Sequence, residues 1–561
     1  MRIILFVFLA CFLNIPAFAQ SPGWAWARSG QNTSSSLNTC VAIDKDDNVY
    51  SVGAFQGSIS FGDSTYICQG LQNIYVTKYD KDGKLIWSQF IGGNGKYVAN
   101  SIVVDRYGSV YVGGATAIDS PNATALWYDM LVVKLNPTGK MLWRKWYGTE
   151  YDDVVTAMAI DSKNNLVFTG YFFGVGTDPA IYDSIRIGDF VLNSKGNTDI
   201  FIAKMDSSGS VFFAKDIGTK KDENAWALSL LKDDHMVMVG SFYSAITFDN
   251  LPQLRSISTG LIVGNSYIVE LDSDGVAEWA QIVGASQVTQ QNAGGELQCM
   301  KLATDSAGNV FVAGNYATCD LKIGSFFLPQ PYDDQGNYDM WFAKLDSRGN
   351  VLWAKNVGGM EADYLRGIAT DKAGNLYVTG EAGNTCVFGS DTIKLPNTAG
   401  EYLFTAKYDG SGNLLWYKIL GGTYGATGYA VSVNNEDEVV VVGGFADAAL
   451  AFGKSVVYNT GSFNGFVAKL NKEGVGVPPT GSGQFSISPN PASNTLQLQT
   501  QQAGQFTSYQ VNNTLGQKVG SGILKSQTEQ SIELPELVDG MYYFSLSGRA
   551  GVVSRKVFIQ H

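Results

Sequence analysis

Three short signals recur in a fixed order along this chain of 561 residues. The first is an apolar segment that ends in glycine, and its seven copies end at Gly53, Gly114, Gly170, Gly240, Gly314, Gly380 and Gly443. Nine residues before these glycines lie Asp44, Asp105, Asp161, Leu231, Asp305, Asp371 and Asn434. Successive glycines are about 55 to 75 residues apart, which indicates a repeat architecture whose units stack on their neighbours.

The second and third signals show that one strand is missing at the end of the array. The second is Lys-x-Asp/Asn-x-x-Gly, which begins at Lys78, Lys134, Lys204, Lys344, Lys407 and Lys469, with Glu270 in the fourth copy. The third is an aromatic residue four positions after that glycine, at Trp87, Trp143, Phe213, Trp279, Trp353 and Trp416. The seventh copy has Pro478 there, whereas Trp24 and Trp26 form a spare segment of the right type. We therefore predict that the N-terminal strand closes a ring beside the strand that contains Lys469.

Each copy contains four β-segments, such as residues 98–105, 110–114, 130–136 and 141–146. The chain is rich in glycine, with 64 residues, and has no sustained helical period, so the predicted class is all-β. Four-stranded units repeated radially form a β-propeller, here with seven blades over residues 20–476. The recurring aromatic residue is expected to pack between neighbouring blades. A linear solenoid would need capping repeats and would leave the N-terminal strand unexplained.

Residues 305–314 and 341–359 carry the clearest copies of two longer patterns. These are Asp-x-x-Gly-Asn-hydrophobic-aromatic-x-x-Gly and Phe-x-Ala-Lys-Leu-Asp-x-x-Gly-x-x-x-Trp-Ala. In both patterns the chain resembles the secreted bacterial β-propeller repeat. The resemblance implies a propeller fold and an extracellular location, and it implies no shared activity.

The N-terminal residues 1–19 have the pattern of a secretory signal peptide. One positive charge and a short apolar run precede Ala17-Phe18-Ala19, so cleavage is predicted between Ala19 and Gln20. The apolar run is too short to span a bilayer, and no transmembrane segment is expected in the mature chain. We therefore predict a secreted or cell-surface protein.

A second domain is predicted at the C-terminus. The Gly/Pro-rich stretch 477–483 is typical of a linker, and residues 484–561 show short alternating strands that predict a small Ig-like β-sandwich. This segment resembles the type A sorting domain of the type IX secretion system of Bacteroidota, and the matching residues include Pro489, Asn490, Pro491, Gly516, Gly540 and Lys556. The resemblance implies recognition by that machinery and removal after export, often with attachment of the cargo to surface lipopolysaccharide. The alternative is a sandwich module that stays on the chain.

The cysteine pattern predicts free thiols. Cys11 lies in the signal peptide, and the mature chain keeps Cys40, Cys68, Cys299, Cys319 and Cys386, an odd number without a C-x-x-C pair. With only two histidines to join them, these thiols do not indicate a zinc site. A disulfide between Cys319 and Cys386, at nearly equivalent places in successive repeats, stays open as the alternative.

No catalytic, cofactor-binding or metal-binding residues are predicted. The net charge of −12, without a basic run, argues against a nucleic-acid partner. Of the two histidines, His561 ends the chain and His235 occupies a turn position, which favours a surface residue. The runs that begin at Asp44 and Asp80 resemble calcium loops only in part, because the downstream bidentate Glu is missing. Calcium therefore remains a weak alternative to no cofactor.

The predicted ring has two different faces. Tight Asp/Gly turns lie on one face, and the other carries the long, dissimilar stretches 171–199, 241–266, 285–298, 315–339 and 381–402. Binding usually resides in variable loops on a rigid scaffold. Among their aromatic residues, we expect Tyr182, Tyr332 and Tyr338 to be able to stack on sugars, and Phe172, Phe242 and Tyr316 to lie in the core. The predicted function is non-enzymatic binding or adhesion at the cell surface, toward a glycan or another protein. The alternative is an extracellular polysaccharide-active or quinoprotein-like enzyme.

Overall fold

All regular elements in the described part of the chain are β-strands, as predicted from the sequence. The computed structural model describes residues 22–117, 127–149, 151–174, 184–257, 265–288, 296–329, 337–388, 391–395, 400–472, 485–488, 492–500, 506–513, 518–538, 540–548 and 551–559. Residues Gly23–Lys472 form one compact unit, and the described residues from 485 onward belong to a second unit.

Within the described part of the first unit, seven sheets each contain an antiparallel run of four strands, which we call a blade. The first strands of the blades are β3 (Ser36–Ile43), β9 (Lys96–Val104), β13 (Val154–Ile160), β19 (Glu223–Leu230), β25 (Glu296–Thr304), β31 (Tyr364–Thr370) and β37 (Ala426–Val433). The second strands are β4 (Val49–Phe55), β10 (Val110–Ala117), β14 (Leu166–Phe173), β20 (Met236–Phe242), β26 (Val310–Ala317), β32 (Leu376–Ala382) and β38 (Val439–Phe445). The third strands are β7 (Asn73–Tyr79), β11 (Asp129–Leu135), β17 (Thr198–Met205), β23 (Asn265–Leu271), β29 (Asp339–Leu345), β35 (Tyr402–Tyr408) and β41 (Asn464–Leu470). The fourth strands are β8 (Leu85–Ile91), β12 (Met141–Tyr147), β18 (Val211–Ile217), β24 (Ala277–Val288), β30 (Val351–Gly359), β36 (Leu414–Leu420) and β1 (Trp24–Ser29).

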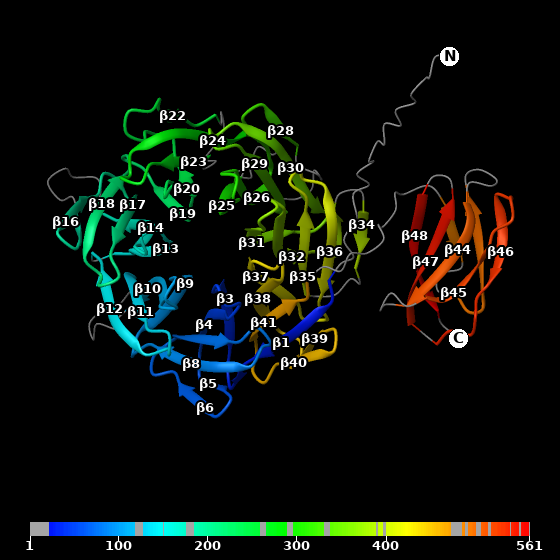
Figure 1. Ribbon diagram of the computed structural model, residues 1–561. Coiled ribbons are helices and arrows are strands. Elements are labelled where there is room, and N and C mark those ends of the chain that lie inside the picture. Colours follow the sequence, from blue (N-terminus) through cyan, green and yellow to red (C-terminus); the bar gives the residue numbers. More distant parts are fainter. Residues whose placement is uncertain are drawn as a thin grey trace, which may run out of the picture. The chain divides into compact units, whose positions relative to one another are not determined.

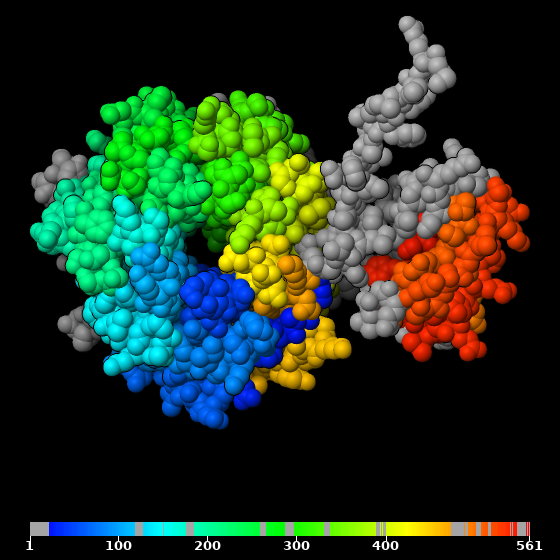
Figure 2. All heavy atoms as spheres, in the orientation of Figure 1, coloured from blue at the N-terminus to red at the C-terminus, as the bar shows by residue number. Residues whose placement is uncertain are grey.

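The blades are arranged around a central axis, with their first strands innermost (Figure 1). Each first strand contacts the first strand of the next blade, and β37 of the last blade contacts β3 of the first. The unit is therefore a β-propeller, and the space-filling view shows a central hollow between the innermost strands (Figure 2). Apolar side chains from neighbouring blades pack into shared clusters, which place the core between the blades.

The repeated glycine of the second strand has a backbone cause. Every first strand contains a β-bulge opposite that glycine, for example between Asn38 and Cys40 opposite Gly53. The bulge brings a carbonyl oxygen of the first strand so close that a Cβ atom on the glycine would overlap it, as Leu37 O would at Gly53. Only glycine therefore fits opposite the bulge.

The recurring aromatic residue of the fourth strand joins each blade to the next. The indole N–H of Trp87 donates to Pro137 O at 3.0 Å, and the ring lies against Gly139 in the turn of the following blade. Trp279 and Trp353 make the same contacts with their own neighbours. Packing between neighbouring blades, expected from the spacing of these residues, is therefore confirmed.

The N-terminal strand supplies the aromatic residue that the last copy lacks. Strand β1 pairs with β41, with Trp26 opposite Lys469, so it lies where the sequence analysis places it. The Trp26 indole donates to Lys81 O of the first blade at 3.1 Å and lies against Gly83, as Trp87 does one blade further on. Trp24 packs edge-on against Phe452, with ring centroids 4.8 Å apart.

The long stretches between second and third strands are more regular than their sequences suggest. Six of them contain a described hairpin or strand pair: β5 (Ser58–Phe61) with β6 (Ser64–Ile67), β15 (Ser184–Ile187) with β16 (Phe190–Asn193), β21 (Ala245–Ile246) with β22 (Leu254–Arg255), β27 (Cys319–Ile323) with β28 (Phe326–Leu328), β33 (Thr385–Phe388) with β34 (Asp391–Lys394), and β39 (Ala449–Phe452) with β40 (Ser455–Tyr458). The short β2 (Gln31–Asn32) joins the first of these hairpins. Strands β27 and β33 pair with β24 and β30, the outer strands of the preceding blades. Much of this variable sequence therefore lies at the rim of the ring.

The C-terminal unit contains two antiparallel sheets. One is formed by β42 (Phe485–Ser488), β43 (Thr495–Thr500) and β46 (Glu529–Glu533), and the other by β44 (Phe506–Asn513), β45 (Lys518–Ile523), β47 (Gly540–Gly548) and β48 (Gly551–Ile559). Leu496 and Leu498 of the first sheet share one buried cluster with Val511 and Phe544 of the second.

Candidate functional site

The aspartates that lie nine residues before the repeated glycines accept hydrogen bonds from the backbone of their own turns. The Asp44 carboxylate accepts the backbone N–H groups of Asp46 at 2.9 Å and Asn48 at 3.0 Å, and its counterparts in other blades cap their turns in the same way. These aspartates therefore stabilise the turns that precede the second strands. In the described part of the chain, no group of three or more His, Cys, Asp or Glu side chains is placed to hold a metal ion.

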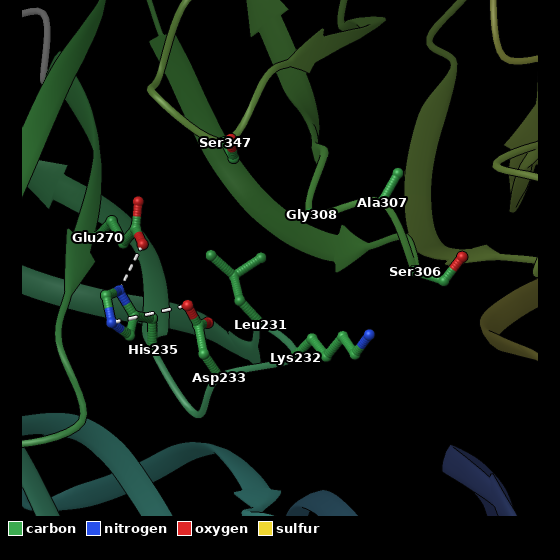
Figure 3. A pocket seen from close by; sticks show the side chains of 9 residues that line it. All are labelled: Leu231, Lys232, Asp233, His235, Glu270, Ser306, Ala307, Gly308 and Ser347. Atoms are coloured by element: carbon green, nitrogen blue, oxygen red, sulfur yellow. Dashed lines mark hydrogen bonds and ion pairs between the residues drawn. The ribbon is translucent and has the colours of Figure 1, made fainter.

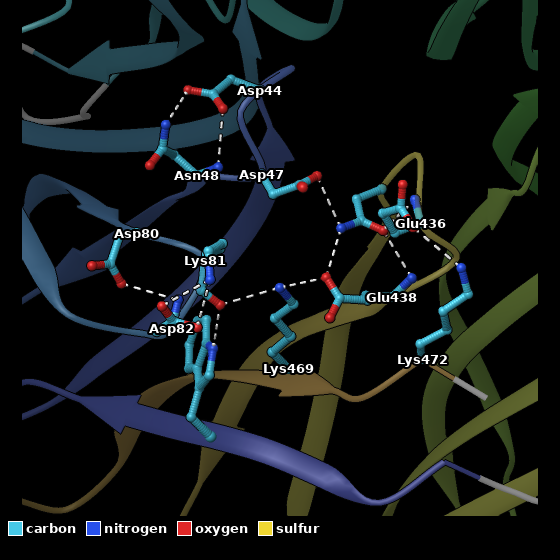
Figure 4. A network of polar contacts seen from close by, with 12 residues as sticks. Asp44, Asp47, Asn48, Asp80, Lys81, Asp82, Glu436, Glu438, Lys469 and Lys472 are labelled. Atoms are coloured by element: carbon cyan, nitrogen blue, oxygen red, sulfur yellow. Dashed lines mark hydrogen bonds and ion pairs between the residues drawn. The ribbon is translucent and has the colours of Figure 1, made fainter. Parts of the chain in front are cut away.

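The same carboxylates also pair with the lysines of the second signal, a contact that the sequence reasoning missed. Lys204 lies 2.7 Å from Asp161, and corresponding pairs join Lys407 to Asp371, Lys344 to Asp305 and Lys78 to Asp44. In the last blade Asn434 replaces the aspartate, and Glu438 supplies the carboxylate instead, 2.7 Å from Lys469 (Figure 4). The pair links the turn before the second strand to the third strand of the same blade.

The fourth blade reverses the charges of this pair. Glu270 stands where the other blades have lysine, and His235 Nδ1 lies 2.8 Å from Glu270 Oε1 (Figure 3). Partial burial would lower the pKa of His235, but the hydrogen bond to Glu270 and the nearby carboxylates outweigh it, so the pKa is raised. His235 is thus an ion-pair partner, with a quarter of its side chain exposed, rather than a simple surface substitution. It lines a pocket of about 500 Å³ together with Lys232, Asp233 and Ser306.

The bulge residues of the seven first strands provide the clearest contrast between blades. They are Thr39, Asn100, Thr156, Trp226, Met300, Arg366 and Tyr429, all partly exposed on the innermost strands. The first three donate to the first strand of the next blade: Thr39 to Ala99 O at 2.9 Å, Asn100 to Val155 O at 3.0 Å and Thr156 to Ala225 O at 2.8 Å. The last four are large side chains. Three of the bulge residues therefore link neighbouring first strands, and the other four are large residues that the repeat does not require.

A polar cluster joins the sixth and seventh blades. Glu381 accepts hydrogen bonds from Arg366 Nη2 at 2.5 Å and from Thr427 Oγ1 at 2.6 Å. Glu401 is exposed overall, yet partial burial of its carboxyl group and the adjoining charge of Glu381 raise its pKa to about 7. Burial and the Glu381 charge also raise the pKa of Tyr429. Two carboxyl groups thus share one site with a guanidinium and a phenol.

Three partly exposed aromatic pairs lie at other places around the ring, between the second and the sixth blades. Trp226 packs against Tyr171 with ring centroids 5.9 Å apart, and the half-exposed Trp127 lies 5.4 Å from Tyr151. Tyr338 packs on Tyr364 at 5.2 Å. The other two aromatic residues expected to stack on sugars, Tyr182 and Tyr332, lie outside the described residues, whereas Phe172, Phe242 and Tyr316 are buried as predicted.

The remaining predicted positions fall as follows. Gly540 pairs with Ile559 and Lys556 with Tyr543, between β47 and β48. The cleavage residues Ala19 and Gln20 and the sorting residues Pro489, Asn490, Pro491 and Gly516 lie outside the described residues.

The five described cysteines are free thiols, so the disulfide between Cys319 and Cys386 is absent and the prediction of free thiols is confirmed. No helix long and apolar enough to span a membrane occurs in the described part of the chain.

Comparisons with known proteins found relatives of low sequence identity. Two curated proteins match most of the chain: an uncharacterized WD repeat-containing protein of Acanthamoeba polyphaga mimivirus, 24% identical over 79% of this chain, and the regulatory protein FlaEY of Caulobacter vibrioides, 23% identical over 65%. The chain spans about two fifths of the length of each, 38% in both cases. The solved WD40 domain of Neurospora crassa Pan2 is 10% identical and aligns over 80% of this chain and 96% of its own, with a TM-score of 0.37.

Two family models match separate parts of the chain. The beta-propeller repeat model matches residues 352–385, and the secretion system C-terminal sorting domain model matches residues 486–560. The second match confirms the resemblance to type IX sorting domains of Bacteroidota, and with it a signal for export. The chain thus combines β-propeller repeats with a C-terminal sorting domain.

Proposed function

We propose that this protein is a non-enzymatic binding or adhesion protein of the outer cell surface. It is a seven-bladed propeller closed by its N-terminal strand and followed by an Ig-like sandwich, and the type IX secretion machinery exports it through residues 484–561. The ligand, a glycan or a surface protein, binds at the central hollow. The sorting-domain match supports export, and the paired strands β1 and β41 support ring closure.

The observation that best supports binding at the central hollow is the difference among the seven bulge residues. All seven positions share one backbone geometry, so a purely structural role would be met by the same kind of side chain in every blade. Thr39, Asn100 and Thr156 meet it with hydrogen bonds to the next first strand. Trp226 and Arg366 instead present large aromatic and charged groups at the same position. Pockets for ligands combine apolar and aromatic walls with a few placed polar groups, which is the character of these large residues.

The test is a glycan and matrix-protein binding screen with the mature chain and two matched variants. Trp226→Ala removes the aromatic residue at the hollow, and Phe212→Ala removes a half-exposed aromatic residue on the outer strand β18. We expect Trp226→Ala to lose binding to the ligand that the screen identifies, and Phe212→Ala to keep it. Equal binding by both variants would place the ligand elsewhere.

A second candidate function, hydrolysis of an extracellular polysaccharide, has one observation in its favour. Glu381 is ion-paired with Arg366, whereas burial and the Glu381 charge raise the pKa of Glu401 to about 7. Paired carboxyl groups whose environments separate their pKa values are a pattern of acid–base catalysis. Release of reducing ends from a polysaccharide panel, lost in both Glu381→Gln and Glu401→Gln, would support this function over simple binding.

A further inference from the structure

A lysine ammonium group joins neighbouring blades at the turn after the third strand. The turn carbonyl of the following blade accepts one hydrogen bond from this ammonium group and another from the recurring tryptophan. The lysine bonds are Lys134 to Ser207 O at 2.7 Å, Lys344 to Gly410 O at 3.3 Å and Lys469 to Lys81 O at 3.1 Å (Figure 4). The indole bonds to the same three oxygens come from Trp143, Trp353 and Trp26. In these blades the repeat therefore places an ammonium group against the turn of the next blade.

The fourth blade replaces this lysine with Glu270, whose ionised carboxylate accepts hydrogen bonds and cannot donate one. Among the described residues, the corresponding turn carbonyl, Ser347 O, accepts only the Trp279 indole N–H, at 3.3 Å. His235 Nδ1 lies 2.8 Å from Glu270 Oε1, and no described residue donates to Oε2. Glu270 and Ser347 O therefore both keep acceptor capacity that the described part of the chain does not fill.

A pocket of about 500 Å³ contains both of these residues in its lining. Its other walls come from the turn 231–235 of the fourth blade and the turn 305–309 of the fifth (Figure 3). Leu231 stands where the other blades have Asp or Asn, so together with Ala307 it gives the pocket an apolar wall. None of the seven bulge residues lines this pocket, and it is bounded by the tight turns of the ring. It is therefore a site distinct from the central hollow.

We propose that this pocket binds the side chain of a lysine residue from a partner protein. The ammonium group lies between the Glu270 carboxylate and Ser347 O, and the aliphatic stem packs along Leu231 and Ala307. The inference goes beyond the proposed function and does not depend on it, because it concerns a different site and a different class of ligand.

The other blades show which chemical group fits this place. Lys344 and Lys469 bond to the turn carbonyl of the next blade and also pair with a carboxylate of their own blade, Asp305 at 3.7 Å and Glu438 at 2.7 Å. An incoming ammonium group would restore the same arrangement of carboxylate, ammonium and carbonyl in the fourth blade. Its hydrogen bonds would be charge-assisted, which makes them stronger than neutral ones.

The lining also distinguishes lysine from other cations. No group of three or more His, Cys, Asp or Glu side chains in the described part of the chain is placed to hold a metal ion, so the pocket does not offer a metal's ligand set. The apolar wall suits the four-carbon stem of lysine, which a short amine lacks. Lys232 and Asp233, both exposed, carry opposite charges at the edge of the pocket and offset one another. The net charge of −12 favours approach by a basic partner.

The probe is lysine capped at both ends as Nα-acetyl-lysine N-methylamide. Its binding to the full chain is titrated by saturation-transfer NMR, which detects weak ligands. Three counterparts separate the parts of the recognition: norleucine with the same caps lacks the ammonium group, capped ε-trimethyl-lysine keeps the charge without N–H donors, and ethanolamine has an ammonium group without the stem. We expect each counterpart to bind at least about 10-fold more weakly, the loss that follows removal of a charge-assisted hydrogen bond or of the packed stem.

Two variants with the same change in charge place the probe in the pocket. Glu270→Lys supplies the ammonium group of the repeat from within the chain and should weaken binding of capped lysine by at least about 10-fold. Glu436→Lys changes an exposed carboxylate in a turn of the seventh blade and should leave binding unchanged. If Glu270→Lys does not fold, the double variant Leu231→Asp/Glu270→Lys, which restores the ion pair of the other blades, and Glu270→Gln, which removes only the charge, provide the same test.

Several outcomes would overturn the assignment. Absence of capped-lysine binding to the full chain, or equal binding by a folded Glu270 variant, would show that the pocket does not bind an ammonium group. Equal binding of capped norleucine or trimethyl-lysine would refute the hydrogen bonds to Glu270 and Ser347 O. Ethanolamine binding as tight as that of capped lysine would refute a lysine side chain as the occupant.

Discussion

Replacing Trp26 by alanine tests whether the N-terminal strand holds the ring together. Trp26 is 5% exposed, contacts the first-blade turn at Gly83, and donates its indole N–H to Lys81 O at 3.1 Å. Truncating a buried tryptophan costs about 3–5 kcal/mol, and the lost hydrogen bond adds about 1 kcal/mol. A unit of about 450 residues has an unfolding entropy that converts each kcal/mol into roughly 1 °C. The expected fall in the melting temperature is therefore about 4–6 °C.

The matched control is Trp146→Ala on β12, because Trp146 is 44% exposed and truncating it should move the melting temperature by less than about 1 °C. Differential scanning calorimetry on the full chain and both variants gives the comparison. Deletion of residues 20–30 removes the whole strand and should cause aggregation or a much larger fall. If Trp26→Ala melts within a degree of Trp146→Ala, strand β1 does not secure the last blade and the closure argument fails.

Three further predictions follow from the glycine, the histidine and the chain ends. Gly314→Ala should lower the melting temperature by several degrees, because the added Cβ would overlap a carbonyl oxygen of the first strand. Gly23→Ala is the control, because its Cβ would make only an ordinary contact and should leave the melting temperature unchanged. Equal melting temperatures of the two variants would contradict the bulge argument. The pKa of His235 is raised in the folded protein, so the ion pair stabilises the fold fully below the unfolded pKa and this stabilisation is lost as pH rises through the folded pKa. His235→Gln should therefore lower the melting temperature more at pH 5.5 than at pH 8.5. An equal fall at both pH values would refute the ion pair. Mass spectrometry of surface material should find Gln20 as the first residue and no peptides beyond about residue 485, and recovery of the full-length chain there would refute the processing.

Side-chain spacing was enough to predict the contacts between blades. The distance from each turn glycine to the next aromatic residue is constant, and the missing seventh residue pointed to the N-terminal segment with Trp24 and Trp26 as the substitute. The aromatic residue and the turn glycine that it contacts are both part of the repeat, so their spacing in the sequence predicts a contact in the folded protein. The all-β class followed from the high glycine content and the absence of a helical period.

The bulges were not predictable, because bulge residues as different as Thr39, Trp226 and Arg366 share no chemistry. Their common feature is a change in the backbone register of the first strand. The sequence shows it only indirectly, through the glycine that the facing second strand requires. The reversed ion pair of the fourth blade did leave a signal: Leu231, His235 and Glu270 all depart from the repeat in one copy. Reading these departures together would have paired His235 with Glu270.

The pairing of β1 with β41 also sets the order in which the fold can be completed. Asn464 donates a hydrogen bond to Gly30 O although the two residues are 434 positions apart in the chain. Contacts between such distant segments form late, because the entropy of closing the intervening loop must be paid before they are gained. The first strand of the chain must therefore wait, with Trp24 and Trp26 unpaired, until nearly the whole ring has been synthesised. The edge of the last blade and the apolar N-terminal segment are exposed together during this interval, which makes it the period in which association between unfinished chains competes with folding.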